Sequence, residues 1–197
     1  MSEQILDVRK RNVMALLTQR AILSTFEEML EEMPFDKVTV SALVKRCGVS
    51  ANTFYYHYQD IYALLDAWLT KKIGEIREKT RDESDWTIET KAILLACQNH
   101  SIIIEHIVNS LSREQMERYV FTQTDDVFNK FVRIRTDGKE LTEEQIAEIA
   151  TFLRYAFLGV FLKANWDHFK GDIDYKVERM GVMFNSFVDS VSDTMKK

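Results

Sequence analysis

Apolar residues recur at helical spacing along most of the chain, beginning in the segment before Pro34. Five of them fall at positions i, i+4, i+7, i+8 and i+11, which places them on one face of a helix. This helix is predicted to end before Pro34, because the residue before a proline avoids the α region. It is expected to begin at Thr18 as an N-cap, or to extend back through Val13–Leu17. The five apolar positions are Ile22, Phe26, Met29, Leu30 and Met33.

Two short helices separated by a glycine are expected next. Thr39 is suited to cap a helix over 40–47, and Gly48 is suited to end it in the left-handed conformation. Ser50 is suited to cap a second short helix over 51–58. A short helix, a sharp glycine turn and a second short helix form a helix-turn-helix.

The middle of the chain continues in helical periods. Asp60 is placed to cap a long helix, and the charged stretch 78–85 indicates a linker. Residues 86–109 form one segment that is apolar on more than one face, and 113–135 is amphipathic.

The last two predicted helices, 143–168 and 174–194, carry many apolar residues. Thr142 and Gln145 form a capping-box pattern at the start of the first of them. This helix is apolar nearly all round and therefore has to be buried on both faces. We expect the two helices to pair with their copies in a second subunit as a four-helix dimer interface. The alternative is an internal pair of core helices.

The sequence predicts an all-α fold with two domains. The chain has 197 residues, one proline and six glycines, so few helix breakers interrupt it. We expect an N-terminal three-helix helix-turn-helix domain over 1–60. A C-terminal helical domain over 61–197 is expected to bind a ligand and to dimerise.

The net charge of the chain is not that of a typical nucleic-acid binder, but the distribution of charge along the chain favours DNA binding in one segment. The formal net charge is −5, whereas the window from Lys37 to Gln59 contains no acidic residue and includes Lys45 and Arg46. A surface that faces phosphates has to exclude negative charge in this way. The helix-turn-helix therefore lies in the part of the chain best suited to meet DNA.

Composition also bears on location. Cys47 and Cys97 are expected to be reduced core thiols of a cytoplasmic protein. The N-terminal segment is polar, and the longest apolar run, 152–162, is interrupted by Arg154, so neither a signal peptide nor a membrane span is expected.

The second short helix carries residues suited to read DNA. Its N-terminal residues Ala51, Asn52 and Thr53 would face base edges in the major groove, where asparagine pairs with adenine and Thr or Ala touches a thymine methyl. Tyr55 and His57 would donate hydrogen bonds to phosphates.

Four short motifs follow one another in this part of the chain: Val38–Thr39–Val40, the turn Gly48–Val49–Ser50, the run Thr53–Phe54–Tyr55–Tyr56–His57–Tyr58, and Leu64–Leu65. On these motifs, residues 18–70 resemble the DNA-binding domain of the TetR family of regulators.

By position, the resemblance implies that Thr39 contacts or caps near a phosphate and that Tyr55 and His57 hold phosphates. It also implies that Ser50–Thr53 and Tyr56 face the bases. For Tyr55 and His57 the alternative is a capping or packing role. Lys45 and Arg46 are further candidates for DNA contact, with ordinary solvated charges as the alternative, whereas Phe54 and Tyr58 are expected in the core. Many relatives have a lysine where this chain has Ile61, so one phosphate contact is expected either to be missing or to be supplied by Arg9–Arg11 or Arg20.

The family resemblance further implies a double-stranded palindromic operator, a homodimer and a small effector held in the C-terminal domain. The candidate effector residues are aromatic or amide side chains, for which plain core packing is the alternative. They are Trp68, Gln98, Asn99, Tyr119, Phe152 and Tyr155. Residues 152–171 are similar to dimerising helices of Firmicutes-type members, some of which respond to a protein partner.

No enzymatic chemistry is expected. The sequence has no P-loop, nucleophile elbow, His-Glu-x-x-His or cysteine cluster, so neither a cofactor nor a metal is predicted. His100 and His106 are six residues apart and do not share a helix face as a metal pair would. We expect a transcriptional repressor released by a small effector. The alternative is an activator-type regulator controlled by a protein partner.

Overall fold

The computed structural model describes residues 2–80 and 85–195, and in residues 2–12 it describes the backbone alone. The described ranges contain α-helices, one short 3-10 helix and no strand, so the predicted all-α fold is confirmed. The helices are α1 (Ser2–Glu32), η1 (Phe35–Lys37), α2 (Val40–Cys47), α3 (Ala51–His57), α4 (Ile61–Lys79), α5 (Trp86–Asn99), α6 (Ser101–Val108), α7 (Arg113–Arg135), α8 (Glu143–Trp166) and α9 (Ile173–Thr194).

The chain divides into two compact units. Unit 1 comprises Met1–Leu69 and Glu105–Ser110, and unit 2 comprises Thr70–Ile104 and Leu111–Lys197. The helix-turn-helix therefore lies wholly in unit 1, and α7, α8 and α9 lie wholly in unit 2.

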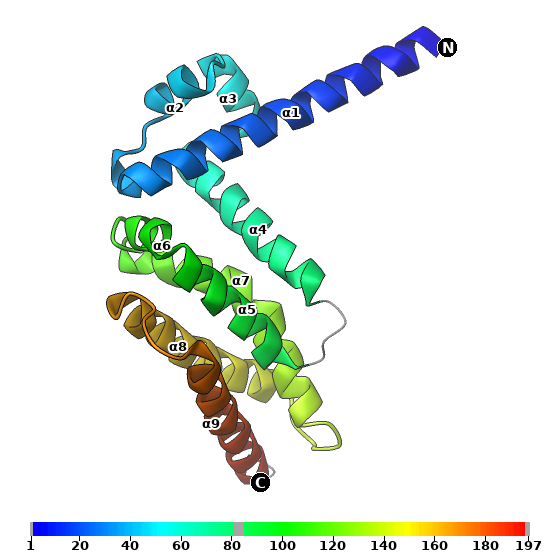
Figure 1. The fold of residues 1–197 in the computed structure, drawn as a ribbon. Helices are drawn as coiled ribbons and strands as arrows, with labels where there is room; N and C mark the ends of the chain where they lie inside the picture. Colours follow the sequence, from blue (N-terminus) through cyan, green and yellow to red (C-terminus); the bar gives the residue numbers. More distant parts are fainter. Residues whose placement is uncertain (1, 81–84, 196–197) are drawn as a thin grey trace. The chain divides into compact units, whose positions relative to one another are not determined.

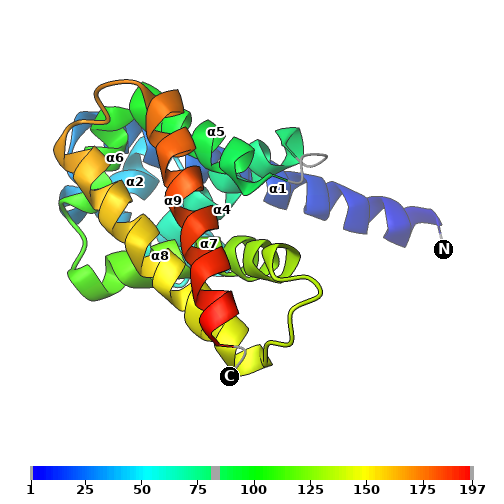
Figure 2. The same ribbon diagram turned by 90° about the horizontal axis from the view of Figure 1, so that it is seen from below.

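Helix α1 contributes buried residues to the core of unit 1. Ile22, Phe26 and Leu30 are fully buried, as their spacing predicts, and α2 packs against this helix. The N-terminal half of α1 extends well past α2 and α3 (Figures 1 and 2). Thr18 is not an N-cap, because the helix begins at Ser2 and the Thr18 hydroxyl donates to the Met14 carbonyl at 2.9 Å.

Residues of the other helices of unit 1 pack in a common core with α1. Leu43 of α2 and Phe54 of α3 are fully buried, and Phe35 meets Phe26 edge-on at 6.2 Å between ring centroids. The end of α6 also belongs to this unit: His106 donates from Nδ1 to the Leu30 carbonyl at 2.7 Å, since a carbonyl can only accept. The remaining large core residues of α4 are Leu64, Leu65 and Trp68.

The segment 86–109 is two helices and not one. Helix α5 ends at Asn99 because His100 leaves the helical region, with φ −119° and ψ 36°, and α6 starts again at Ser101. The expected linker 78–85 also differs, because α4 continues to Lys79; residues 81–84 lie outside the described part.

Unit 2 is built around aromatic rings. Trp86 stacks on Phe184 of α9 at 5.4 Å and also contacts Phe128 and Phe131 of α7. With Phe157 of α8, which contacts Phe128, these rings join α5, α7, α8 and α9 into one core. Figure 2 shows α8 and α9 lying side by side. Large aromatic side chains bury the most area per residue, so this cluster supplies much of the stabilisation of the unit.

Helix α8 starts and ends for local reasons. The predicted capping box is confirmed, since Thr142 accepts from the Gln145 amide N–H and Gln145 accepts from that of Thr142. The helix ends at Trp166, two residues earlier than predicted, because His168 and Phe169 take the left-handed conformation with φ 55° and 51°.

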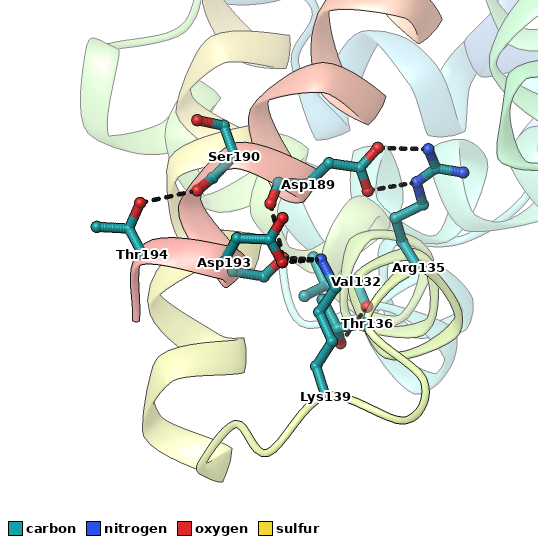
Figure 3. A network of polar contacts seen from close by, with 9 residues as sticks. Val132, Arg135, Thr136, Lys139, Asp189, Ser190, Asp193 and Thr194 are labelled. Carbon is teal, nitrogen blue, oxygen red and sulfur yellow. Dashed lines mark hydrogen bonds and ion pairs between the residues drawn. The ribbon is translucent and has the colours of Figure 1, made fainter. Parts of the chain in front are cut away.

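Ion pairs join the ends of α7 and α9 (Figure 3). Arg135 forms two hydrogen bonds with Asp189, at 2.9 and 2.5 Å, and lowers the pKa of that carboxyl group. Lys139 reaches both the Asp193 carboxylate and the hydroxyl of the buried Ser192. These contacts fix the C-terminal turns of α9 against α7.

Helix α8 is long and apolar enough to cross a membrane by length and composition, contrary to the expectation that no segment would be. Its inner face, including Leu153 and Phe157, is buried in the core of unit 2. Arg154 in mid-helix pairs with Asp125 of α7. These features are those of a core helix in a helical bundle.

Candidate nucleic-acid interface

Local hydrogen bonds shape the helix-turn-helix as the sequence predicts. Thr39 caps α2 by accepting from the Ala42 amide at 3.2 Å, and Ser50 caps α3 by accepting from the Thr53 amide at 3.0 Å. Between them Gly48 has φ 74°, a conformation that costs a residue with a Cβ about 1–2 kcal/mol. The turn therefore depends on glycine.

Helix α3 has one buried and one exposed face. Phe54 and Tyr58 are 0% and 6% exposed, which confirms their predicted core positions, and burial raises the pKa of Tyr58. Tyr55 and Tyr56 are 57% and 80% exposed. A helix anchored through one face by two aromatic rings presents its opposite face rigidly to a partner.

The exposed strip of α3 consists of small, amide and tyrosine side chains. Ala51, Asn52, Tyr55 and Tyr56 are all exposed and lie at i, i+1, i+4 and i+5, so they share one face. The Thr53 hydroxyl is 2.8 Å from that of Ser50, and both are therefore held at the N-terminal end of the helix.

His57 lies at the C-terminal end of α3 and carries two ring nitrogens that can form hydrogen bonds. Its ring packs edge-on against Tyr56 at 5.0 Å and is half-buried. This ring contact restricts the orientation of the imidazole.

The two basic residues of α2 have different surroundings. Lys45 is exposed and forms no ion pair with the described residues. Arg46 forks onto Glu32 with N–O distances of 2.6 and 2.7 Å. The hydrogen bond with Arg46 lowers the pKa of Glu32 and raises that of Arg46.

The start of α4 lacks a cation. Asp60 caps this helix by accepting from the Ala63 amide at 2.8 Å, and Ile61 beside it is half-buried. Arg20 on α1 is exposed, whereas the side chains of Arg9–Arg11 lie outside the described part of the chain.

The candidate effector residues are divided between the two units. Trp68 is buried in unit 1, where its indole N–H donates to Glu27, while the other five belong to unit 2. Tyr119 is buried, Asn99 is exposed, and the Gln98 amide donates to the Phe169 and Gly171 carbonyls.

The other two candidates, Phe152 and Tyr155, are 55% and 47% exposed on α8. Phe152 stacks on Phe187 at 4.4 Å, and the Tyr155 hydroxyl donates to Glu117 at 2.6 Å. That hydrogen bond raises the pKa of Tyr155.

Sequence reasoning missed an open hollow of about 440 Å³ along the first turns of α7. Its lining residues lie at i, i+1, i+4, i+5 and i+8, the spacing of one helix face, which the amphipathic pattern of 113–135 contains. They are Arg113, Glu114, Glu117, Arg118 and Phe121.

Among the described side chains, no group of three or more His, Cys, Asp or Glu residues is placed to hold a metal ion. His106 instead donates to the Leu30 carbonyl in unit 1, and the buried Cys97 and half-buried Cys47 are free thiols.

Solved structures with the same fold are regulators. The dihydroxyacetone kinase operon activator DhaS matches with a TM-score of 0.66 at 14% identity, over 88% of this chain and 97% of that one. NalD, the secondary repressor of the MexAB-OprM multidrug efflux pump in Pseudomonas aeruginosa, matches with a TM-score of 0.53 at 17% identity, over 85% and 93%. A transcriptional regulator from Aquifex aeolicus VF5 matches with a TM-score of 0.52 at 18% identity, over 83% and 95%.

Family models cover both parts of the chain. A search of curated proteins by sequence gives no significant match. Residues 22–68 match the model of bacterial regulatory proteins of the tetR family, and this range includes the whole helix-turn-helix. Residues 84–186, more than half of the chain, match the C-terminal region of transcriptional regulators of this type. The chain belongs to the TetR family of transcriptional regulators.

Proposed function

We propose that this regulator binds a palindromic DNA operator as a homodimer, with α3 of each subunit in the major groove. The observation that carries the proposal is the division of α3 into a face anchored by Phe54 and Tyr58 and an exposed face with Asn52, Tyr55 and Tyr56. A recognition helix needs both, because its base-reading side chains have to be held in a fixed register.

Each exposed residue has a proposed role. Asn52 reads a base edge, with Ala51, Thr53, Ser50 and Tyr56 beside it at the N-terminal and outer side of α3. Four further side chains hold phosphates and set the register without reading sequence. The proposed phosphate contacts are Thr39, Lys45, Tyr55 and His57.

Dimerisation is proposed through α8 and α9 of unit 2. The outer face of α8 carries exposed residues at i, i+3, i+7, i+10 and i+14, the spacing of a helix-pairing seam. Gly159 lies at its centre, where an added Cβ would meet nothing within 4 Å, so a second helix can approach closely. The seam residues are Phe152, Tyr155, Gly159, Leu162 and Trp166, and α9 adds exposed Tyr175, Val182 and Met183.

The burial pattern supports this assignment. Trp166 and Val182 are 82% and 66% exposed in the single chain. Contiguous exposed apolar patches on folded proteins mark interaction surfaces. We therefore propose that residues 1–60 bind DNA and that 61–197 dimerise and receive the regulatory signal, in the cytoplasm.

Two modes of regulation each have an observation in their favour. Release by a small effector is supported by the hollow at Arg113, Glu117 and Phe121, which offers charged and aromatic side chains to a ligand on one open face of α7. Control by a protein partner is supported by the five candidate effector residues of unit 2, none of which lines this hollow. NalD is a repressor and DhaS an activator, and both share the fold; we propose repression as the default mode.

Selection from a randomised DNA library with the wild-type protein tests the DNA-binding proposal. The expected product is an inverted repeat whose half-sites lie about 34–36 Å or more apart, and a footprint of the same length. A single unpaired half-site, or no enrichment of any sequence, contradicts the proposal. Thermal-shift screening of small metabolites separates the two modes of regulation, because an effector that binds the folded state raises its melting temperature.

A further inference from the structure

Arg46 of α2 is engaged by two carboxylates of α1. Its Nη1 and Nη2 donate to the two carboxylate oxygens of Glu32 at 2.6 and 2.7 Å, and Nη2 also donates to Glu28 at 3.3 Å. Glu28 and Glu32 are four residues apart and therefore lie on one face of α1. A planar guanidinium that forks onto a carboxylate is held in one orientation as well as one position.

Apolar packing holds one side of α2. The helix is eight residues long; Leu43 is fully buried, and Val40, Val44 and Cys47 on the same face are half-buried. A helix of this length takes its stability from such tertiary contacts. The fork from Arg46 supplies a second point of attachment on the side of α1.

The position of Arg46 links this attachment to DNA reading. It lies two residues before Gly48, whose turn leads directly into the Ser50 cap of α3. Helix α2 packs against both α1 and α3. A rotation of α2 on α1 would therefore shift the start of α3, where Asn52 is proposed to read a base.

The neighbouring Lys45 differs from Arg46 in its ion pairing. It is exposed, and no described carboxylate pairs with it. Its charge is thus available to a phosphate, while that of Arg46 is matched by Glu32 and Glu28.

We propose that Arg46 is a positioning residue of the helix-turn-helix, which acts through Glu32 and Glu28 on α2 and through α2 on α3, and is not a phosphate ligand. The inference rests on the proposed DNA-binding function and refines it. Of the two basic residues of α2, Lys45 alone contacts the DNA backbone.

A charge swap tests the proposal with a duplex selected by the wild-type protein from a randomised library. Arg46→Glu places three carboxylates together and is expected to weaken binding about tenfold or more. Adding Glu32→Arg restores an ion pair of opposite direction and is expected to recover binding to within about threefold of wild type. A glutamate at 46 that faced a phosphate would not be rescued, so a double variant no better than Arg46→Glu overturns the proposal.

Lys45 provides the matched control. Lys45→Glu is expected to weaken binding as well, but Glu32→Arg should not rescue it. In a salt titration, Lys45→Gln is expected to lower the slope of log Kd against log salt by about one, whereas Arg46→Gln leaves the slope unchanged. A loss of about one for Arg46→Gln overturns the proposal.

Hydrogen exchange separates this inference from the DNA-binding proposal. Amide exchange in α2 and α3 is expected to accelerate in Arg46→Glu and to return to the wild-type rate in the swap, without DNA. Unchanged exchange in Arg46→Glu contradicts the positioning role. Failure of the wild-type protein to select any duplex contradicts the proposed function alone, since the exchange measurement still decides the role of Arg46.

Discussion

The side-chain amide of Gln98 donates to the backbone carbonyl of Phe169 at 2.6 Å, across 71 residues of sequence. The same amide reaches the Gly171 carbonyl at 3.3 Å. Phe169 is fully buried and, like His168, has a positive φ. The hydrogen bond thus stabilises the turn between α8 and α9, in which two consecutive residues have a left-handed backbone conformation that L-residues rarely adopt. It also connects α5 to that turn.

Gln98→Ala is expected to destabilise the protein by about 1–3 kcal/mol, because the Phe169 carbonyl loses its donor in a buried setting. Urea unfolding followed by circular dichroism measures the loss. The adjacent and exposed Asn99 provides the control, and Asn99→Ala should change stability by less than about 0.5 kcal/mol. Equal stability of the two variants would show that the Gln98 contact contributes nothing.

Most of the predicted helix caps are confirmed, but Thr18, a cap candidate by the same local signal, lies inside α1. Thr39, Ser50 and Thr142 all cap the helices that their positions predict, and Gly48 has the expected positive φ. A cap depends on residues within one turn, so its pattern is complete in a short window.

The parts that depend on distant residues could not be predicted in this way. The fork from Arg46 to Glu32 requires knowledge of how α1 and α2 cross, and it decides whether that cation is free. The left-handed turn at His168 and Phe169 has no sequence signal, because glycine is the residue expected at positive φ. The exposure of the outer face of α8 likewise depends on how α5, α7 and α9 pack against its inner face.

Substitutions at two exposed residues of α3 are expected to change DNA binding in different ways. Tyr55→Ala removes a proposed phosphate contact, so it should weaken binding to all DNA sequences by a similar factor. Asn52→Ala removes a proposed base contact worth about 1–3 kcal/mol of discrimination, so it should change which sequence is preferred. Binding selection on both variants measures this, and identical losses on every sequence for both would contradict the assigned roles.

The two cysteines are expected to differ in reactivity. Burial raises the pKa of Cys97 to about 12, so near neutral pH its thiolate, the reactive form, is almost absent. Cys47 is half-buried. Iodoacetamide should therefore modify Cys47 well before Cys97 in the folded protein, as followed by mass spectrometry, and both at similar rates in urea. Equal rates in the folded protein would contradict the burial of Cys97.

Acid is expected to weaken the contact between α7 and α9. The hydrogen bond with Arg135 lowers the folded-state pKa of Asp189 below its unfolded value, so its contribution to stability is present above about pH 4 and is lost as pH falls through the folded-state pKa. Asp189→Asn should lower stability at neutral pH, and its difference from wild type should shrink in acid.

Urea unfolding at neutral pH and near about pH 3 measures this change. Asp126→Asn is the control, because Asp126 is exposed and has no ion pair among the described residues. A difference between Asp189→Asn and wild type that stays constant with pH would contradict the linkage.

A charge in the α8 seam is expected to separate the proposed dimer. Trp166 is 82% exposed in the single chain, and burying an unpaired carboxylate at a subunit interface is costly, so Trp166→Glu should yield monomers in sedimentation equilibrium. Operator affinity should fall with it, because a monomer holds one half-site and loses the gain from linking two. Ile134 of α7 is 56% exposed and outside the seam, so Ile134→Glu is the matched control and should remain dimeric. A Trp166→Glu protein that remains dimeric would place the subunit interface elsewhere than at the end of this seam.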